Sequence, residues 1–433
     1  MTPEQVLALA NSDAMRKNAQ KLAQPKAWLS LNANERVAWG ELKGSAAEPY
    51  QVRFDLLDLG YKCSCPSQTH PCKHAVALML LYAENPSAFP PDTSPPPWVT
   101  SWITSRDARA AKKAEKESGE IADPAAQAKR IAERETKVSA GIDALDLWLR
   151  DLVRSGFDGL PSQPPTFWEA PAARMVDAQA RGLANQLQEM AKVTQMGLGW
   201  ANRLLERAGM LYLLLEGYRH QEALPPDLRA DVRSIVGWNQ KQEDLLDLPA
   251  VRDEWLVLSQ REHEEDRAEI QRTWLRGLST GKTALLLEFS FNHQPFELKL
   301  PGGTRFDADL IYYPSQYPQR AIISQRRKTL PPQPMIAGES IPTALAAYAE
   351  AISRQPWLNL FPMLLADVYP LRTETGWIVR DAASHALPFG HYVEAGWKLL
   401  AISGGYPLTI FGEWNGERLL ILTAWVNDRM LLL

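Results

Sequence analysis

Residues 61–78 read YKCSCPSQTHPCKHAVAL, and this stretch holds every cysteine of the 433-residue chain: Cys63, Cys65 and Cys72. His74 follows two residues after the last of them, so the spacing is C-x-C-x₆-C-x-H. Three cysteines are an odd number and cannot form a closed set of disulfides. In a reducing compartment, such a cluster indicates metal or redox chemistry.

The spacing suits a zinc ion, which prefers thiolate and imidazole ligands in a tetrahedron. A C-x-C pair at the end of a strand turns both thiolates to one side, and a loop with Pro66 and Pro71 brings the chain back. Cys72 and His74 then lie at the start of an apolar helical run, Ala75–Tyr82, whose N-terminus stabilises thiolates. Four protein ligands leave no open position, which predicts one structural Zn²⁺ and no catalytic residue.

Two alternatives for the same residues stay open. Cys63 and Cys65 could cycle as a redox disulfide, although C-x-C closes a strained loop and leaves Cys72 and His74 unexplained. His70, which lies in the loop between the prolines, could replace His74 as the fourth ligand. Iron–sulfur ligation normally needs four cysteines, and this chain has three.

The residues around the cluster support a small folded unit. Helical patterning covers Pro3–Leu22, and two strand-like stretches follow at Arg36–Lys43 and Tyr50–Leu57. With the helix at Ala75–Tyr82, the cluster would complete a strand–strand–helix (ββα) module. A unit of fewer than 90 residues would depend on the metal for much of its stability.

The signature and its context resemble the SWIM zinc finger, a strand–strand–helix module with the pattern C-x-C-x(n)-C-x-H. The resemblance implies that Cys63, Cys65, Cys72 and His74 bind one zinc ion, and that the protein binds DNA or another protein. The stretches 145–153 and 173–179 are similar to larger bacterial proteins that carry one such finger near the N-terminus.

A chain of 433 residues predicts more than one domain. We expect an α+β protein with a finger segment (1–89), a Pro-rich and charged linker (90–124), a helical domain (125–275) and a mixed α+β domain (276–433). The predicted helices are the apolar seam from Ile131 to Leu152, then Ala172–Val193, Gly199–Leu215, Asp227–Trp238 and Pro249 to about Leu275. The predicted C-terminal elements are a helix capped by Ser340 and strands at 284–291, 296–300, 308–312, 319–324, 376–379, 408–414 and 419–425.

Composition narrows the classes of function. The formal net charge is −4, whereas proteins that coat nucleic acid usually have a basic excess. The polar N-terminus predicts no signal peptide, and no apolar run is long enough for a membrane span. We therefore expect a cytoplasmic protein without a membrane partner.

Other motifs give weak signals. Gly277–Thr283 is one residue short of a phosphate loop and precedes a strand instead of a helix, so an ordinary turn is predicted. Asp307, Asp309, Glu288 and His293 could converge in an enzymatic C-terminal site, but their spacing predicts no geometry.

These observations favour a non-enzymatic interaction protein that binds another protein, with no small-molecule substrate evident. The alternative is DNA binding through the finger, where Lys43, Arg53, Lys62 and Lys73 could contact phosphates.

Overall fold

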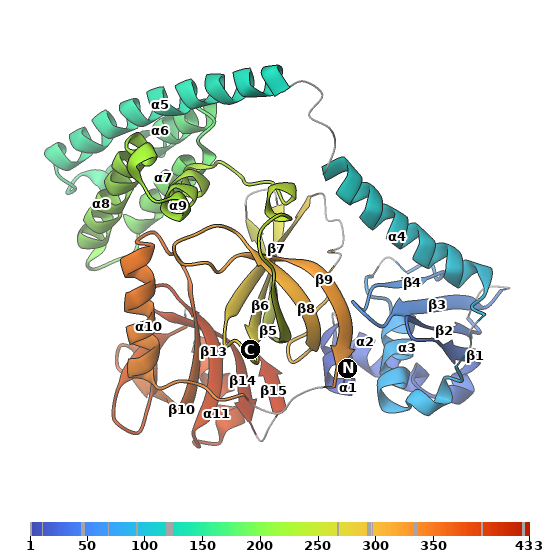
Figure 1. The fold of residues 1–433 in the computed structure, drawn as a ribbon. Coiled ribbons are helices and arrows are strands. Elements are labelled where there is room, and N and C mark those ends of the chain that lie inside the picture. Colours follow the sequence, from blue (N-terminus) through green and yellow to red (C-terminus); the bar gives the residue numbers. More distant parts are fainter. Residues whose placement is uncertain are drawn as a thin grey trace.

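The computed structural model of the chain shows an N-terminal unit, a helical bundle and a C-terminal part built on two β-sheets (Figure 1). The residues that the structure describes are 2–10, 12–44, 48–67, 69–91, 94–117, 124–265, 268–291, 296, 298–331, 336–390, 393–426 and 429–433. The predicted fold class, α+β with an N-terminal finger, a helical middle and a mixed C-terminal part, is confirmed.

The N-terminal unit is a four-stranded sheet with helices on one face. The antiparallel strands lie in the order β1 (Trp28–Ala33), β2 (Val37–Leu42), β3 (Tyr50–Asp55) and β4 (Tyr61–Cys63). The helices are α1 (Pro3–Ala8), α2 (Asp13–Leu22) and α3 (Lys73–Glu84). Val52, Phe54 and Leu78 are fully buried between the sheet and α3. The two predicted strands are confirmed, and β1 was not predicted.

The predicted linker is wrong for residues 97–117, which form helix α4 (Pro97–Glu117). Val99 and Trp102 of α4 pack on Val37 and Trp39, on the sheet face away from α3. Prolines are tolerated in the first turn of a helix, and Ala, Lys and Glu favour helix. The apolar residues of α4 come before its charged residues. The charged stretch considered by itself therefore predicted a solvated connector.

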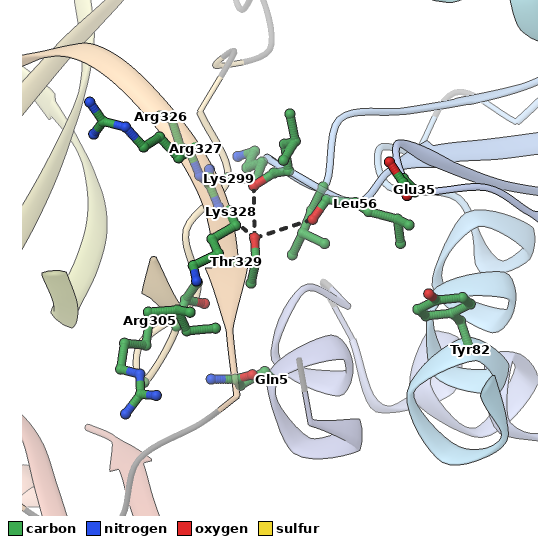
Figure 2. A pocket seen from close by; sticks show the side chains of 15 residues that line it. Gln5, Glu35, Leu56, Tyr82, Lys299, Arg305, Arg326, Arg327, Lys328 and Thr329 are labelled. Atoms are coloured by element: carbon green, nitrogen blue, oxygen red, sulfur yellow. Dashed lines mark hydrogen bonds between the residues drawn. The ribbon is translucent and has the colours of Figure 1, made fainter. Parts of the chain in front are cut away.

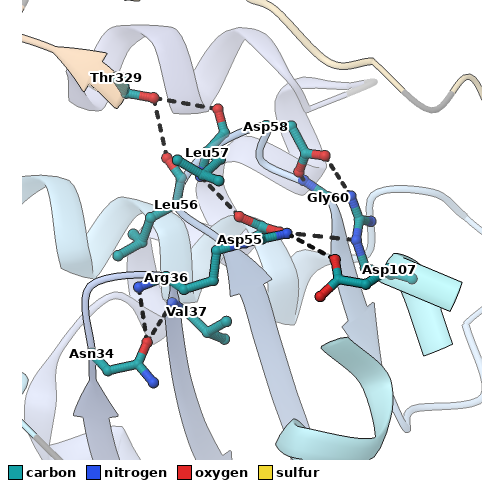
Figure 3. Close-up of polar contacts among 11 residues, drawn as sticks. Asn34, Arg36, Val37, Asp55, Leu56, Leu57, Asp58, Gly60, Asp107 and Thr329 are labelled. Atoms are coloured by element: carbon teal, nitrogen blue, oxygen red, sulfur yellow. Dashed lines mark hydrogen bonds and ion pairs between the residues drawn. The ribbon is translucent and has the colours of Figure 1, made fainter. Parts of the chain in front are cut away.

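Polar contacts also join α4 to the sheet (Figure 3). Arg36 donates from Nε to Asp55 at 2.9 Å and from Nη2 to Asp107 of α4 at 3.3 Å. Arg106 of α4 pairs with Asp58 in the loop after β3. The N-terminal unit therefore has three layers, with α4 as the third.

The middle of the chain is all helical. Its helices are α5 (Pro124–Ser155), α6 (Thr166–Asp177), α7 (Arg181–Val193), α8 (Trp200–Arg219) and α9 (Pro226–Val236). The predicted seam is buried from Val138 to Leu152, whereas Ile131 is exposed. The predicted single helix Ala172–Val193 is two helices, because Gln179 has a φ of 61° and breaks the helical path.

The helix predicted from Pro249 to about Leu275 is wrong, because this segment forms two long paired strands. They are β5 (Val251–Glu265) and β6 (Ala268–Gly277). Trp255 and Val257 face one core while Leu256 and Leu258 face another. A strand buried on both faces is a continuous apolar run, which periodicity alone cannot separate from a helix.

The C-terminal part has two sheets that share a core. The five-stranded sheet has the order β7 (Thr283–Phe291), β6, β5, β8 (Arg305–Tyr312) and β9 (Ala321–Leu330). The six-stranded sheet has the order β12 (Ala386–Phe389), β11 (Gly376–Arg380), β10 (Phe361–Thr373), β13 (Leu408–Trp414), β14 (Leu419–Val426) and β15 (Arg429–Leu432). The aromatic rings of Trp274 and Phe411 contact each other between the two sheets, with their centroids 6.3 Å apart.

Two helices pack on the six-stranded sheet: α10 (Ile341–Arg354) and α11 (Val393–Ser403). Ser340 caps α10 as predicted, accepting a hydrogen bond from the backbone of Thr343. The predicted strand at 296–300 is wrong for its described residues, Phe296 and Leu298–Leu300, which lie outside any strand.

Direct contacts connect the three parts. The hydroxyl of Thr329 in β9 donates to the backbone oxygens of Leu56 and Leu57, at 3.2 and 3.3 Å (Figure 3). Buried Asp231 of α9 accepts hydrogen bonds from the backbone of Gln316 and the side chain of Gln355. The C-terminal part therefore touches both the N-terminal unit and the bundle.

Candidate metal centre

The structure brings the four predicted ligands together at one end of the N-terminal sheet. Cys63 is the last residue of β4, Cys65 lies in the turn after it, Cys72 is the N-cap of α3 and His74 is in its first turn. One potential ligand atom from each residue lies within 4.8 Å of those of the other three. Residues from a strand, a turn and a helix thus converge on one point.

Local backbone contacts hold the first pair in place. Cys63 lies opposite Val52 in the β3–β4 ladder. The Ser64 amide donates a hydrogen bond to the Gln51 carbonyl at 3.1 Å, and the Gln51 amide donates one to the Ser64 hydroxyl at 2.9 Å. The Cys65 amide lies 3.5 Å from the Cys63 sulfur and donates to it. These contacts orient both sulfurs toward the other two ligands.

Burial and hydrogen bonding affect the acidity of the three thiols differently. Cys72 and His74 are buried, at 3% and 6% exposure, whereas Cys63 and Cys65 are half-buried. A hydrogen bond from Cys63 lowers the pKa of the Cys72 thiol, and the same contact raises the pKa of Cys63. Burial raises the pKa of Cys65. Zinc binds cysteine as the thiolate, so metal binding at this cluster releases the protons that its thiols carry.

The donor set fits a zinc ion. The Cys63 sulfur and His74 Nδ1 are 3.9 Å apart, while ideal Zn–S and Zn–N bonds in a tetrahedron separate such atoms by about 3.5 Å. Three sulfurs and one imidazole nitrogen are borderline-soft ligands of the kind that structural zinc sites use. The chain supplies all four positions, so the site binds a single structural zinc.

The alternatives for the cluster fit the geometry less well. His70 is exposed and is not part of the four-residue group. A redox pair of Cys63 and Cys65 does not explain why Cys72 and His74 approach the same point. Among the described residues, this is the one group of at least three His, Cys, Asp or Glu side chains close enough to hold a metal.

Of the four basic residues expected to contact phosphates, three remain at the surface. Lys43, Lys62 and Lys73 are exposed. Arg53 is buried at 6% exposure, with its guanidinium 5.0 Å from the ring of Trp98 and 5.7 Å from that of Trp102. Arg53 therefore holds α4 against the sheet, a role that its sequence neighbours do not indicate.

The structure describes three of the other candidate residues, and each of them contacts a basic or amide side chain. Asp307 and Asp309 of β8 pair with Arg252 and Arg327. Glu288 accepts a hydrogen bond from the Gln271 side chain at 2.7 Å. His293 lies outside the described residues.

Gly277–Thr283 is the β6–β7 connection, as predicted for an ordinary turn. The Asp253 carboxylate accepts hydrogen bonds from the backbone amides of Ser279 and Thr280. The backbone amides of this turn therefore bind a carboxylate of the protein itself.

Among the described helices, none has the length and apolar character needed to cross a bilayer.

A groove lies beside the metal centre. It has a volume of about 640 Å³. Its walls include Met15 and Leu22 of α2, Tyr50 of β3, and the ligands Cys65 and His74. Lys43 and Lys73 also line it. We call this the zinc-side groove.

Comparison with known families identifies two parts of the chain. Residues 50–83 match the SWIM zinc finger, and residues 133–236 match the SWIM-associated four-helix bundle domain. Comparison with curated proteins and with solved structures gave no significant match. The first match covers β3, β4, all four ligands and α3 up to Ala83, and the second covers the helical bundle. The chain therefore contains a SWIM zinc finger at residues 50–83, followed by a SWIM-associated four-helix bundle domain at residues 133–236.

Proposed function

We propose that this protein is a non-enzymatic scaffold whose zinc finger docks another protein at the zinc-side groove. The closed set of four protein ligands supports this proposal most directly, because a zinc ion without an open position cannot polarise a substrate or activate water. The metal then has the task of shaping the surface around it. Its place of action would be the cytoplasm, where three thiols stay reduced.

The groove has the mixed character of a protein-binding surface. Met15, Leu22 and Tyr50 supply apolar wall, and Lys43 and Lys73 supply positive charge. None of the described residues that line it is acidic. A partner segment with an apolar anchor and acidic neighbours would match both features.

Affinity capture with quantitative mass spectrometry tests this function. The bait would be the intact protein, Cys72→Ser, Lys73→Glu in the groove, or Lys137→Gln on the exposed side of α5. We expect the same partner with the intact protein and Lys137→Gln, and its loss with the other two. The purified partner should then bind the intact protein at least tenfold more tightly than Lys73→Glu. Equal binding to all four baits would contradict the proposal.

Nucleic-acid binding through the finger is the second candidate. Exposed Lys43, Lys62 and Lys73 near the metal centre favour it, whereas buried Arg53 cannot contribute a phosphate contact. Three phosphate contacts predict an affinity that falls roughly fortyfold between 50 and 200 mM salt, because log affinity falls with log salt with a slope of about −0.9 per contact. A mobility shift at both salt concentrations tests this candidate, and no shift at the lower one would remove it.

A further inference from the structure

A second cavity lies between the N-terminal unit and the C-terminal sheet, away from the zinc. It has a volume of about 350 Å³. Figure 2 shows β9 with Arg326–Thr329 on one side, and Gln5 of α1 and Tyr82 of α3 on the other. Thr329 bridges the two sides through its hydrogen bonds to Leu56 and Leu57. We call this cavity the interdomain cleft.

The lining of the interdomain cleft is strongly cationic. Five of its side chains are basic and one is acidic: Lys299, Arg305, Arg326, Arg327 and Lys328 against Glu35. Three of the basic residues also have carboxylate partners, because Lys299 lies 2.6 Å from Glu262, Arg305 lies 3.9 Å from Glu254, and Arg327 pairs with Asp309. Lys328 is exposed. Arg326 and Lys328 therefore carry most of the positive charge available to a ligand.

Among these cations, Arg326 has the most buried side-chain nitrogen atoms without a hydrogen-bond partner. Its Nε and Nη1 atoms are buried and have no hydrogen-bond partner among the residues that the structure describes. Its Nη2 donates to Thr329 at 3.2 Å, and its guanidinium lies 4.6 Å from the ring of Phe306. Burial lowers the pKa of Arg326 to about 10, so the side chain still carries its charge at neutral pH. Leaving donors of a buried cation unmatched costs free energy, which an anion in the cleft would recover.

The two acids of the N-terminal unit whose charges act on Arg326 are already engaged. Asp55 pairs with Arg36 at 2.9 Å, and Asp58 pairs with Arg106 (Figure 3). Both acids act on Arg326 only through longer-range electrostatics. Among the described residues, no carboxylate therefore matches the buried Nε and Nη1 of Arg326, and an external anion would do so.

We propose that the interdomain cleft binds a phosphate-bearing small molecule. Guanidinium groups recognise phosphate oxygens through paired hydrogen bonds, and lysine adds a point charge. Leu56, Leu59 and Tyr82 give the cleft an apolar wall, which suits an organic group attached to the phosphate. A volume of about 350 Å³ is near the lower end for small-molecule pockets. This inference is independent of the protein partner proposed for the zinc-side groove.

Calorimetric titration of the zinc-loaded full chain tests the proposal, with pyrophosphate, ADP and unphosphorylated adenosine as probes at low salt. We expect pyrophosphate and ADP to bind and adenosine not to bind. Arg326→Met and Lys328→Gln should each weaken binding about tenfold, the effect of losing one charge-assisted hydrogen bond. Lys137→Gln, an exposed lysine of α5 outside the cleft, should leave the affinity unchanged.

A 5′-phosphorylated oligonucleotide and its unphosphorylated form distinguish a free small molecule from a nucleic-acid end. Tighter binding of the phosphorylated strand than of ADP, lost in Lys328→Gln, would keep the phosphate site but make a nucleic-acid end its ligand. If circular dichroism shows that Arg326→Met is unfolded, Lys328→Gln alone tests the proposal, because Lys328 is exposed. No binding of any phosphate-bearing probe, or binding unchanged in Lys328→Gln, would overturn the proposal.

Discussion

Arg53 shows how one side chain can serve the metal centre without touching the metal. Its guanidinium lies over Trp98 and Trp102, and its positive charge lies near Cys63. A site with three thiolates and a neutral imidazole around Zn²⁺ has a formal charge of −1. A buried cation next to it offsets that charge, while the aromatic rings compensate the cation for its lost water.

Replacing Arg53 with Met should loosen the N-terminal unit. The loss of a desolvated cation–π contact costs about 1–2 kcal/mol. We expect the slowest amides of β2 and β3 to exchange hydrogen roughly five- to thirtyfold faster. Lys62→Met is the matched control, because Lys62 lies opposite Arg53 in the β3–β4 ladder but is exposed. Equal acceleration in both variants would contradict the stacking role of Arg53.

At the scale of elements, the part played by α4 depends on a few apolar residues at its start. Val99 and Trp102 are buried against Val37 and Trp39. Trp102→Ala should therefore destabilise the N-terminal unit by about 3 kcal/mol, the usual cost of deleting a buried aromatic side chain. Thr104→Ala, an exposed position of the same helix, should change stability by less than about 0.5 kcal/mol.

Hydrogen exchange of the β2 amides measures the stability of the N-terminal unit in both α4 variants. Faster exchange in Trp102→Ala than in Thr104→Ala is the expected outcome. If Trp102→Ala exchanged like the unmodified chain, α4 would not be a layer of the folded unit.

The sequence was more informative about local patterns than about burial. The ligands were predictable because metal binding requires particular residue types at short spacings. Cys63 to His74 lie close together in the sequence, from the end of a strand to the first turn of a helix. The turn between β13 and β14 contains Asn415-Gly416, a dipeptide that favours hairpin turns, and Gly416 there has a φ of 94°. β5 was not predictable, because Trp255–Leu258 is apolar on both faces and only tertiary packing separates strand from helix there.

At the scale of the whole molecule, zinc should stabilise one part of the chain and not the others. The metal joins β4 to α3, while the bundle has its own buried core, with Val138, Ile142 and Leu187 among its members. A strong chelator should therefore make residues 2–91 susceptible to protease and leave residues 124–236 protected. Limited proteolysis with peptide mapping checks this, and added zinc should restore protection. An N-terminal cleavage pattern that ignores the chelator would contradict it.

The arrangement of the parts could not be predicted from the sequence. The interdomain cleft combines Tyr82 with Arg326, and the contact from Thr329 to Leu56 spans 273 positions. No local sequence pattern encodes such distant pairs. Three of the five cations of the cleft, Arg326 to Lys328, are consecutive in the sequence, but that basic run alone does not indicate a cavity.

The most direct test of the metal centre is the zinc content of the purified full chain, measured by inductively coupled plasma mass spectrometry without a histidine tag. We expect one zinc per chain for the unmodified protein and for His70→Ala, and less than about one tenth for Cys72→Ser. Substoichiometric zinc in the unmodified protein, or loss of zinc in His70→Ala, would show that Cys63, Cys65, Cys72 and His74 are not the ligands.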